Sequence, residues 1–102
     1  MRLVIAILRP AQVEHARQAL ADIQVTRLTV CDAHEYDLAM PETLAQEAVL
    51  EIAVNDDFLD RTLDTLAAVV TAGGDDMQER VRVLPIDEAV QLYREVRGPE
   101  AI

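Results

Sequence analysis

The chain has 102 residues, of which 51% are hydrophobic and only 3% aromatic, so it can bury one aliphatic core. Its formal net charge of −10 argues against nucleic acid and against an anionic membrane surface, since both attract basic proteins. No apolar run approaches the roughly 20 residues that span a bilayer, and no signal-peptide cleavage pattern follows the N-terminus. A single cysteine, Cys31, excludes an internal disulfide. We therefore expect a cytoplasmic protein with one domain over residues 1–102 and no membrane insertion.

Residues 2–9 predict a strand that is apolar on both faces before it stops at Arg9-Pro10. Its two faces carry Leu3, Ile5 and Ile7 on one side and Val4, Ala6 and Leu8 on the other. Both sides of such a strand need a cover. We expect the helices to cover the first set, and the side with Val4, Ala6 and Leu8 to face another copy of the chain.

The next elements alternate between helix and strand. Pro10 suits the first turn of a helix, whose apolar positions would be Val13, Ala16, Leu20 and Ile23. Residues 25–34 alternate as a strand, residues 35–46 lack a clean period and predict a loop broken by Pro41, and residues 48–55 predict another strand. The alternation indicates two strands joined by a loop of about a dozen residues.

The second half repeats this pattern. Asn55 or Asp56 would cap a helix with an apolar stripe, and Gly73 or Gly74 would end it. The stripe consists of Leu59, Leu63, Leu66, Ala67 and Val70. Residues 80–85 predict a short strand with Val81 and Val83 inward, and the tail predicts a helical turn followed by a strand or an extended segment. The order βαββαβ plus a tail indicates an α+β, ferredoxin-like split βαβ fold.

In that fold two helices cover one face of a four-stranded sheet and leave the other face bare. An apolar bare face favours sheet-to-sheet packing of subunits, because large exposed apolar patches usually mark interfaces.

The sequence resembles the PII signalling proteins, also called nitrogen regulatory protein P-II. The resemblance rests on "MRLVIAILRP", "VEHARQALADIQVTRLTV", "VLEIAVNDD", "PIDEAVQL" and "RGPEAI", in that order and spacing. It implies a compact homotrimer and a regulatory protein without catalytic residues. It also implies clefts between subunits where a small effector such as AMP, ADP or ATP binds, and a partner such as a membrane transporter or a metabolic enzyme.

The same resemblance implies which residues would line the cleft. Thr29 matches a threonine that contacts adenine, and Ala53 matches a backbone contact to the base. Gly74 belongs to the loop after the second helix, and Arg80 stands in for a phosphate-binding lysine of that loop.

Several positions depart from the family pattern. Glu35 and Asp37 stand where glycines approach the phosphates, and Gln91 and Tyr93 replace a pair of arginines. The recognition loop between the second and third strands is shortened, and Tyr36 is not at the modified tyrosine's position. These departures weaken the phosphate-binding part of the cleft, so which effector binds, and whether any nucleotide does, stays open.

Two alternatives remain. Cys31, Asp32 and His34 would form part of a metal site only if their strand ended by residue 32, which would favour a metal-handling trimer similar to the CutA family. The other alternative is an effector-free interaction module. We predict no resident metal.

Overall fold

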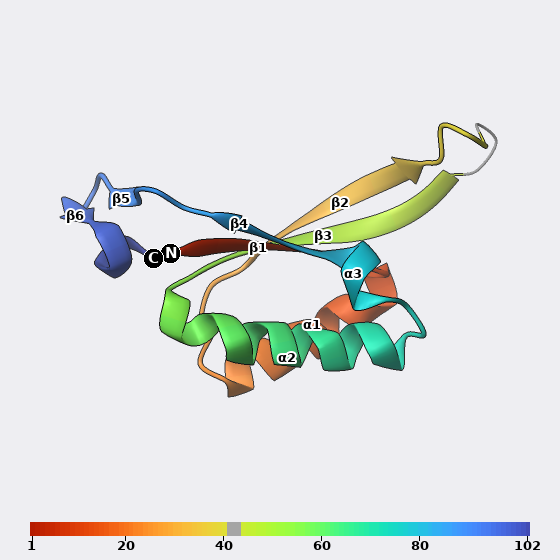
Figure 1. Cartoon of the computed structure of the whole chain (residues 1–102), viewed down its shortest axis with the longest axis horizontal. Helices are drawn as coiled ribbons and strands as arrows, with labels where there is room; N and C mark the ends of the chain where they lie inside the picture. Colours follow the sequence, from red (N-terminus) through yellow and green to blue (C-terminus); the bar gives the residue numbers. More distant parts are fainter. Residues whose placement is uncertain (41–43) are drawn as a thin grey trace.

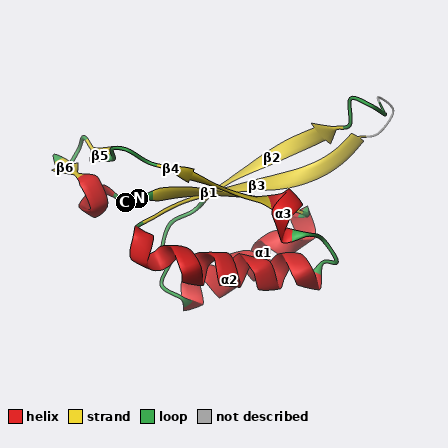
Figure 2. Cartoon of the chain, viewed as in Figure 1, coloured by secondary structure: helices red, strands yellow, loops and turns green. Residues whose placement is uncertain are grey.

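The computed structural model describes residues 1–40 and 44–102, and it contains one four-stranded sheet, two long helices and a C-terminal appendage (Figures 1 and 2). The elements are β1 (Arg2–Leu8), η1 (Pro10–Gln12), α1 (Val13–Asp22), β2 (Thr29–Tyr36), β3 (Leu44–Val54), α2 (Asp56–Ala72), α3 (Met77–Arg80), β4 (Val81–Pro85), β5 (Val90–Gln91), β6 (Val96–Arg97) and η2 (Gly98–Ala101). Within the described residues, no helix has the length and apolar character that crossing a membrane requires.

The sheet is antiparallel with the order β2-β3-β1-β4, so β1 lies in the interior and pairs with both β3 and β4. Helices α1 and α2 lie side by side on one face of this sheet (Figure 1). This arrangement is the α+β, ferredoxin-like split βαβ fold that the element order predicts.

The helices cover the face of β1 that we predicted to be open. Val4, Ala6 and Leu8 are fully buried among the helix residues, whereas Leu3, Ile5 and Ile7 are only partly buried. The expected assignment of the two faces was therefore wrong, and they are exchanged. Both sides of β1 are apolar, so the period-2 pattern showed two buried faces without distinguishing which one meets the helices.

The core contains aliphatic residues from both helices and the two central strands. Ala16 and Leu20 of α1 and Leu66 and Val70 of α2 are fully buried, as their helical spacing predicts. Thr62 is also buried, and its hydroxyl donates a 2.8 Å hydrogen bond to the carbonyl of Phe58, which satisfies it within the helix.

The open face of the sheet is apolar along β1 and flanked by charge. Cross-strand pairing places Glu51 on one side of Ile5 and Arg82 on the other, and Thr29 continues the same row beyond Glu51. Leu3 lies between Ala53 and Leu84 on this face. The open face therefore has an aliphatic centre with one acidic and one basic neighbour.

Strands β2 and β3 continue beyond the helices as a projecting hairpin (Figure 1). Pairing runs from Thr29↔Glu51 to Tyr36↔Leu44, so the loop that we expected over residues 35–46 is shorter and lies between Tyr36 and Leu44. Pro41 falls outside the described residues. At the start of the loop, Asp37 accepts a 2.9 Å hydrogen bond from the amide of Ala39, and its carbonyl accepts one from Met40. An Asx turn of this kind favours a chain reversal.

The C-terminal part lacks the helical turn that we expected after β4, but it forms strands, which was one of the two expectations for the tail. The chain after β4 forms a separate two-stranded hairpin, with Val90 opposite Arg97 and Gln91 opposite Val96, followed by η2. Val83 is 39% exposed on the edge strand β4, whereas Val81 packs against the core. Val81 pairs with Ala6 and Val83 with Val4, so both valines lie on the helix-covered face as predicted, although Val83 is less buried.

Candidate functional site

Thr29 and Ala53 line one broad groove on the open side of the sheet. The groove has a volume of about 970 Å³. Glu51, which pairs with Thr29, and Leu3, which pairs with Ala53, also line it. Both Thr29 and Ala53 are exposed. The groove can accept a planar, partly apolar group, since its lining combines aliphatic side chains with threonine hydroxyls, one carboxylate and two guanidiniums.

Arg80 lies at a second hollow on the same face. This hollow has a volume of about 350 Å³ and is lined by Ile7, Glu35, Glu79, Arg80 and Arg82. Leu3 borders the first groove and Ile7 borders the second, so the two hollows lie near opposite ends of β1. One copy of the chain therefore does not bring Arg80 together with Thr29 and Ala53 in a single cavity.

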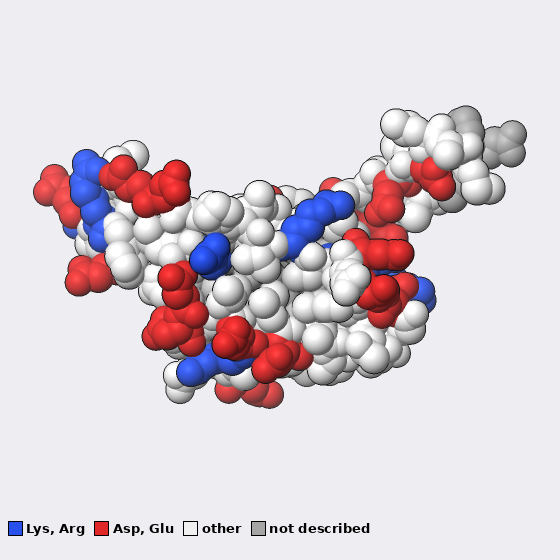
Figure 3. Space-filling view, viewed as in Figure 1, with Lys and Arg blue, Asp and Glu red and all other residues white. Residues whose placement is uncertain are grey.

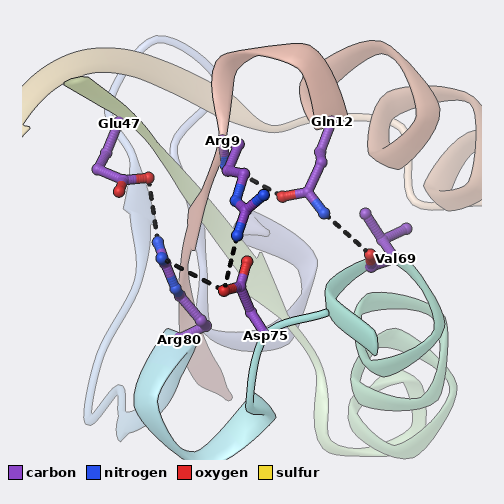
Figure 4. A network of polar contacts seen from close by, with 6 residues as sticks. All are labelled: Arg9, Gln12, Glu47, Val69, Asp75 and Arg80. Atoms are coloured by element: carbon purple, nitrogen blue, oxygen red, sulfur yellow. Dashed lines mark hydrogen bonds and ion pairs between the residues drawn. The ribbon is translucent and has the colours of Figure 1, made fainter. Parts of the chain in front are cut away.

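The guanidinium of Arg80 is engaged by carboxylates of the same chain (Figure 4). Its Nη1 donates a 3.0 Å hydrogen bond to Oε2 of Glu47, and its Nη2 lies 3.7 Å from Oδ1 of Asp75. The same oxygen of Asp75 accepts a 3.2 Å hydrogen bond from Arg9. Arg80 and Glu47 are largely buried, with side chains 20% and 8% exposed, so this pair is less screened than a surface ion pair.

Gln12 extends this network toward α2. Its Oε1 accepts a hydrogen bond from the backbone amide of Arg9, and its Nε2 donates one of 3.1 Å to the carbonyl of Val69 (Figure 4). The network thus connects the end of β1 with β3, the last turns of α2 and the end of α3.

Gly74 ends α2 and does not line either hollow. It has a left-handed backbone with φ of 81°, its amide donates to the carbonyl of Thr71, and the amide of Asp75 donates to the carbonyl of Val70. This pair of hydrogen bonds is a Schellman motif, which favours glycine at this position. The local sequence "TAGGDD" therefore has a structural role in stopping the helix and directing Asp75 toward Arg80.

Cys31 and His34 do not meet the condition for a metal site. Strand β2 continues to Tyr36, so Cys31 projects to one face and Asp32 and His34 to the other. Among residues 1–40 and 44–102, no group of three His, Cys, Asp or Glu side chains is placed to hold a metal ion.

The model of one protein family, nitrogen regulatory protein P-II, matches residues 1–96 of this chain. The chain belongs to the P-II family. It is 30% identical to nitrogen regulatory protein GlnK1 of Methanosarcina mazei, and the match covers 100% of the chain and 97% of that protein. It is 28% identical to nitrogen regulatory protein P-II of Rhizobium etli, over 100% of both chains. The resemblance noted from the sequence is thereby confirmed, and the chain is a nitrogen regulatory, PII-like signalling protein.

The fold comparison agrees. The crystal structure of Arabidopsis thaliana PII bound to citrate superposes with a TM-score of 0.85 at 24% identity, covering 99% of this P-II chain and 91% of that one. At 24% sequence identity, this superposition shows that the two proteins share a fold.

Residue-by-residue reasoning missed the carboxylates that engage Arg80. The resemblance assigned Arg80 to phosphate binding, whereas in the protomer both Arg80 and Arg9 contact Asp75. The available signal was the charge imbalance, because 19 acidic residues compete for nine basic ones. Acidic side chains are spread over several parts of the surface, and basic side chains are fewer (Figure 3).

Proposed function

We propose that this P-II family member assembles as a homotrimer through its open sheet face and binds a small effector, an adenine nucleotide, in clefts between subunits. Binding would change how the projecting β2–β3 hairpin contacts a partner transporter or enzyme. The proposal includes a single domain, a cytoplasmic location and a regulatory role without catalysis. The family membership and the apolar open face support it.

The positions of the two hollows on the open sheet face support this placement of the effector cleft between subunits. Thr29 and Ala53 line one hollow on the open face, and Arg80 lines another near the opposite end of β1. If open faces pack together, both hollows lie at the border of the interface, where the base-binding part of one copy can meet Arg80 of the next. Gly74 would contribute indirectly, by directing Asp75 toward Arg80.

The hairpin has the character of a docking element. Tyr36, Leu38, Met40 and Leu44 are all more than half exposed at its outer end. Exposed apolar side chains on a projecting hairpin favour contact with another protein. An effector that orders this hairpin would shift the population of docking-competent molecules according to its differential affinity for the two states.

The engagement of Arg80 by Glu47 and Asp75 favours a second candidate, an effector-free interaction module. A phosphate would have to compete with two carboxylates for the guanidinium, and Glu35 and Glu79 add two further negative charges to the hollow. In that case the chain would dock its partner whatever the nucleotide concentration.

Thermal unfolding with ATP, ADP, AMP, citrate or divalent metals tests the proposal. A ligand at ~100 times its Kd adds about 2.7 kcal/mol of stability, which gives a clear shift in midpoint. Glu47→Gln, which removes one competing charge, is expected to strengthen the binding of a nucleotide that uses Arg80. If no adenine nucleotide shifts the midpoint of either protein, the effector-free module is the better description.

A further inference from the structure

The open face of the sheet carries two opposite charges on either side of one isoleucine. Arg82 of β4 and Glu51 of β3 both pair with Ile5 of β1, and side chains directly opposite in an antiparallel sheet project to the same face. Their surroundings on this face are apolar: Leu3 pairs with Ala53 and Leu84, and Ile7 pairs with Val49. The face therefore has a basic residue on its β4 side and an acidic residue on its β3 side, with an aliphatic strip between them.

Among the described residues, neither charge has a partner in the protomer. Arg82 and Glu51 form no ion pair within 4.0 Å over residues 1–40 and 44–102, and both residues are exposed. Strand β1 lies between them, so their backbones are about 10 Å apart at the usual strand spacing. By contrast, Arg80 is held by Glu47 of the same chain. Arg82 and Glu51 are thus available to another molecule.

An interface on this face has to accommodate both charges. The apolar strip favours self-association, but burial of an unpaired charge is costly, so Arg82 and Glu51 need partners in any sheet-to-sheet interface. A second copy of the chain supplies both partners, because its β3 side offers a carboxylate and its β4 side offers a guanidinium. Like charges that faced each other would oppose other alignments, so the pair would also set the register of the subunits. Repeated around a ring, this contact uses each basic side and each acidic side once, which allows the assembly to close.

The same contact would complete the effector cleft. Glu51 lines the broad groove together with Thr29 and Ala53, whereas Arg82 lines the hollow that contains Arg80. Contact between Glu51 of one copy and Arg82 of the next would therefore bring the groove of the first copy toward Arg80 of the second. The two halves of the cleft, which one protomer keeps apart, would meet without a change in the fold.

We propose that the open sheet face recognises a second copy of this chain through an ion pair between Glu51 of one copy and Arg82 of the next. The inference deepens the proposed function and rests on it, since it names the charged contact that aligns the subunits of the homotrimer and assembles the effector cleft. The ion pair supplies the alignment, and the aliphatic residues around Ile5 supply the apolar contact.

Charge reversal of the two residues, separately and together, tests the pair. Sedimentation velocity over a range of concentrations measures self-association of the full chain without added ligand. Glu51→Arg and Arg82→Glu each place like charges together across the interface, so we expect each to raise the dissociation constant of the assembly about tenfold or more. The double variant restores opposite charges in exchanged positions and should recover most of the association. Far-UV circular dichroism of each variant checks that the protomer is still folded.

Asp64→Arg is the matched control. Asp64 is exposed on α2, which covers the other face of the sheet (Figure 1). Arg82→Glu combined with Asp64→Arg keeps the formal net charge of −10 but does not rebuild the pair, so it should stay as dissociated as Arg82→Glu alone. Glu51→Arg makes the net charge less negative, which by itself would favour association, so a loss of association in this variant reports the local contact.

The ion pair is overturned if both single reversals associate like the parent protein, or if Asp64→Arg rescues Arg82→Glu as well as Glu51→Arg does. Either result in a trimeric parent protein contradicts the pair and leaves the homotrimer standing. A dimeric parent protein that both reversals weaken and the double variant restores contradicts the trimer and supports the pair. A monomeric parent protein contradicts both.

Discussion

Arg80 donates a 3.0 Å hydrogen bond to Glu47, whose side chain is only 8% exposed and which lies in β3, 33 residues earlier in the chain. The pair joins the end of α3 to β3 in the projecting hairpin. A buried carboxylate is stable only when paired, so Arg80 has a structural role in the isolated protomer whether or not it also binds phosphate.

Removing Arg80 should therefore destabilise the protein. Breaking a buried ion pair from one side costs about 3–5 kcal/mol, and we expect Arg80→Ala to lie near ~3 kcal/mol because the arginine is partly exposed. Urea unfolding measures the loss. Arg80→Ala combined with Glu47→Ala should recover part of the lost stability, since no unpaired carboxylate then remains.

If the single variant Arg80→Ala is as stable as the parent protein, the ion pair contributes nothing to the stability of the fold. Nucleotide affinity of Arg80 variants should be compared at temperatures where each variant is fully folded.

Ile5 should control self-association through the open sheet face. It lies at the centre of that face, and Ile5→Asp would place a charge in an apolar interface, adjacent to Glu51. We expect the parent protein to sediment as a trimer at micromolar concentration and Ile5→Asp to sediment as a monomer. Leu92→Asp is the control, because Leu92 is 85% exposed in the β5–β6 turn and should not affect the sheet interface. A monomeric parent protein would contradict the proposed assembly.

Gly74 should matter for stability through its backbone. A side chain in the left-handed region costs roughly 1–2 kcal/mol, so Gly74→Ala should lower the free energy of unfolding by about 1 kcal/mol. Gly74→Asn should cost less, because asparagine tolerates this conformation better than alanine. No atom lies within 4 Å of the position a Cβ would take, so the loss would come from conformation and not from a clash. Equal stability of glycine and alanine, measured by thermal unfolding, would contradict this account.

Glu14 should titrate at lower pH than an ordinary glutamate. The hydrogen bonds that Arg17 donates to its carboxylate lower its pKa below the usual value of 4.5. A carboxyl whose folded-state pKa is depressed stabilises the fold above its unfolded pKa, and this contribution is lost as the pH falls through the folded pKa. NMR titration of the Glu14 side chain measures the shift, and Arg17→Gln should move the pKa back toward its usual value. An unchanged pKa in that variant would show that Arg17 is not the cause.

The sequence by itself determined the order of the elements and the family. Helical spacing of Ala16, Leu20, Leu66 and Val70 specifies buried helix faces, and period-2 alternation specifies the strands, because both signals are local. The helix stop was predicted at Gly73 or Gly74, since a left-handed residue after a helix strongly favours glycine, and the structure places the left-handed residue at Gly74.

Only the tertiary structure decided which face of β1 meets the helices, how far β2 and β3 extend, and which charges pair. The faces of β1 are both apolar, so their assignment depends on the packing of α1 and α2 and not on the strand itself. Likewise Arg80 has several carboxylates near it in the sequence, among them Asp75, but its closest partner, Glu47, comes from β3, 33 residues earlier. Pairing across such distances depends on the fold, because the energy of an ion pair is set by separation and burial, which a linear sequence does not encode locally.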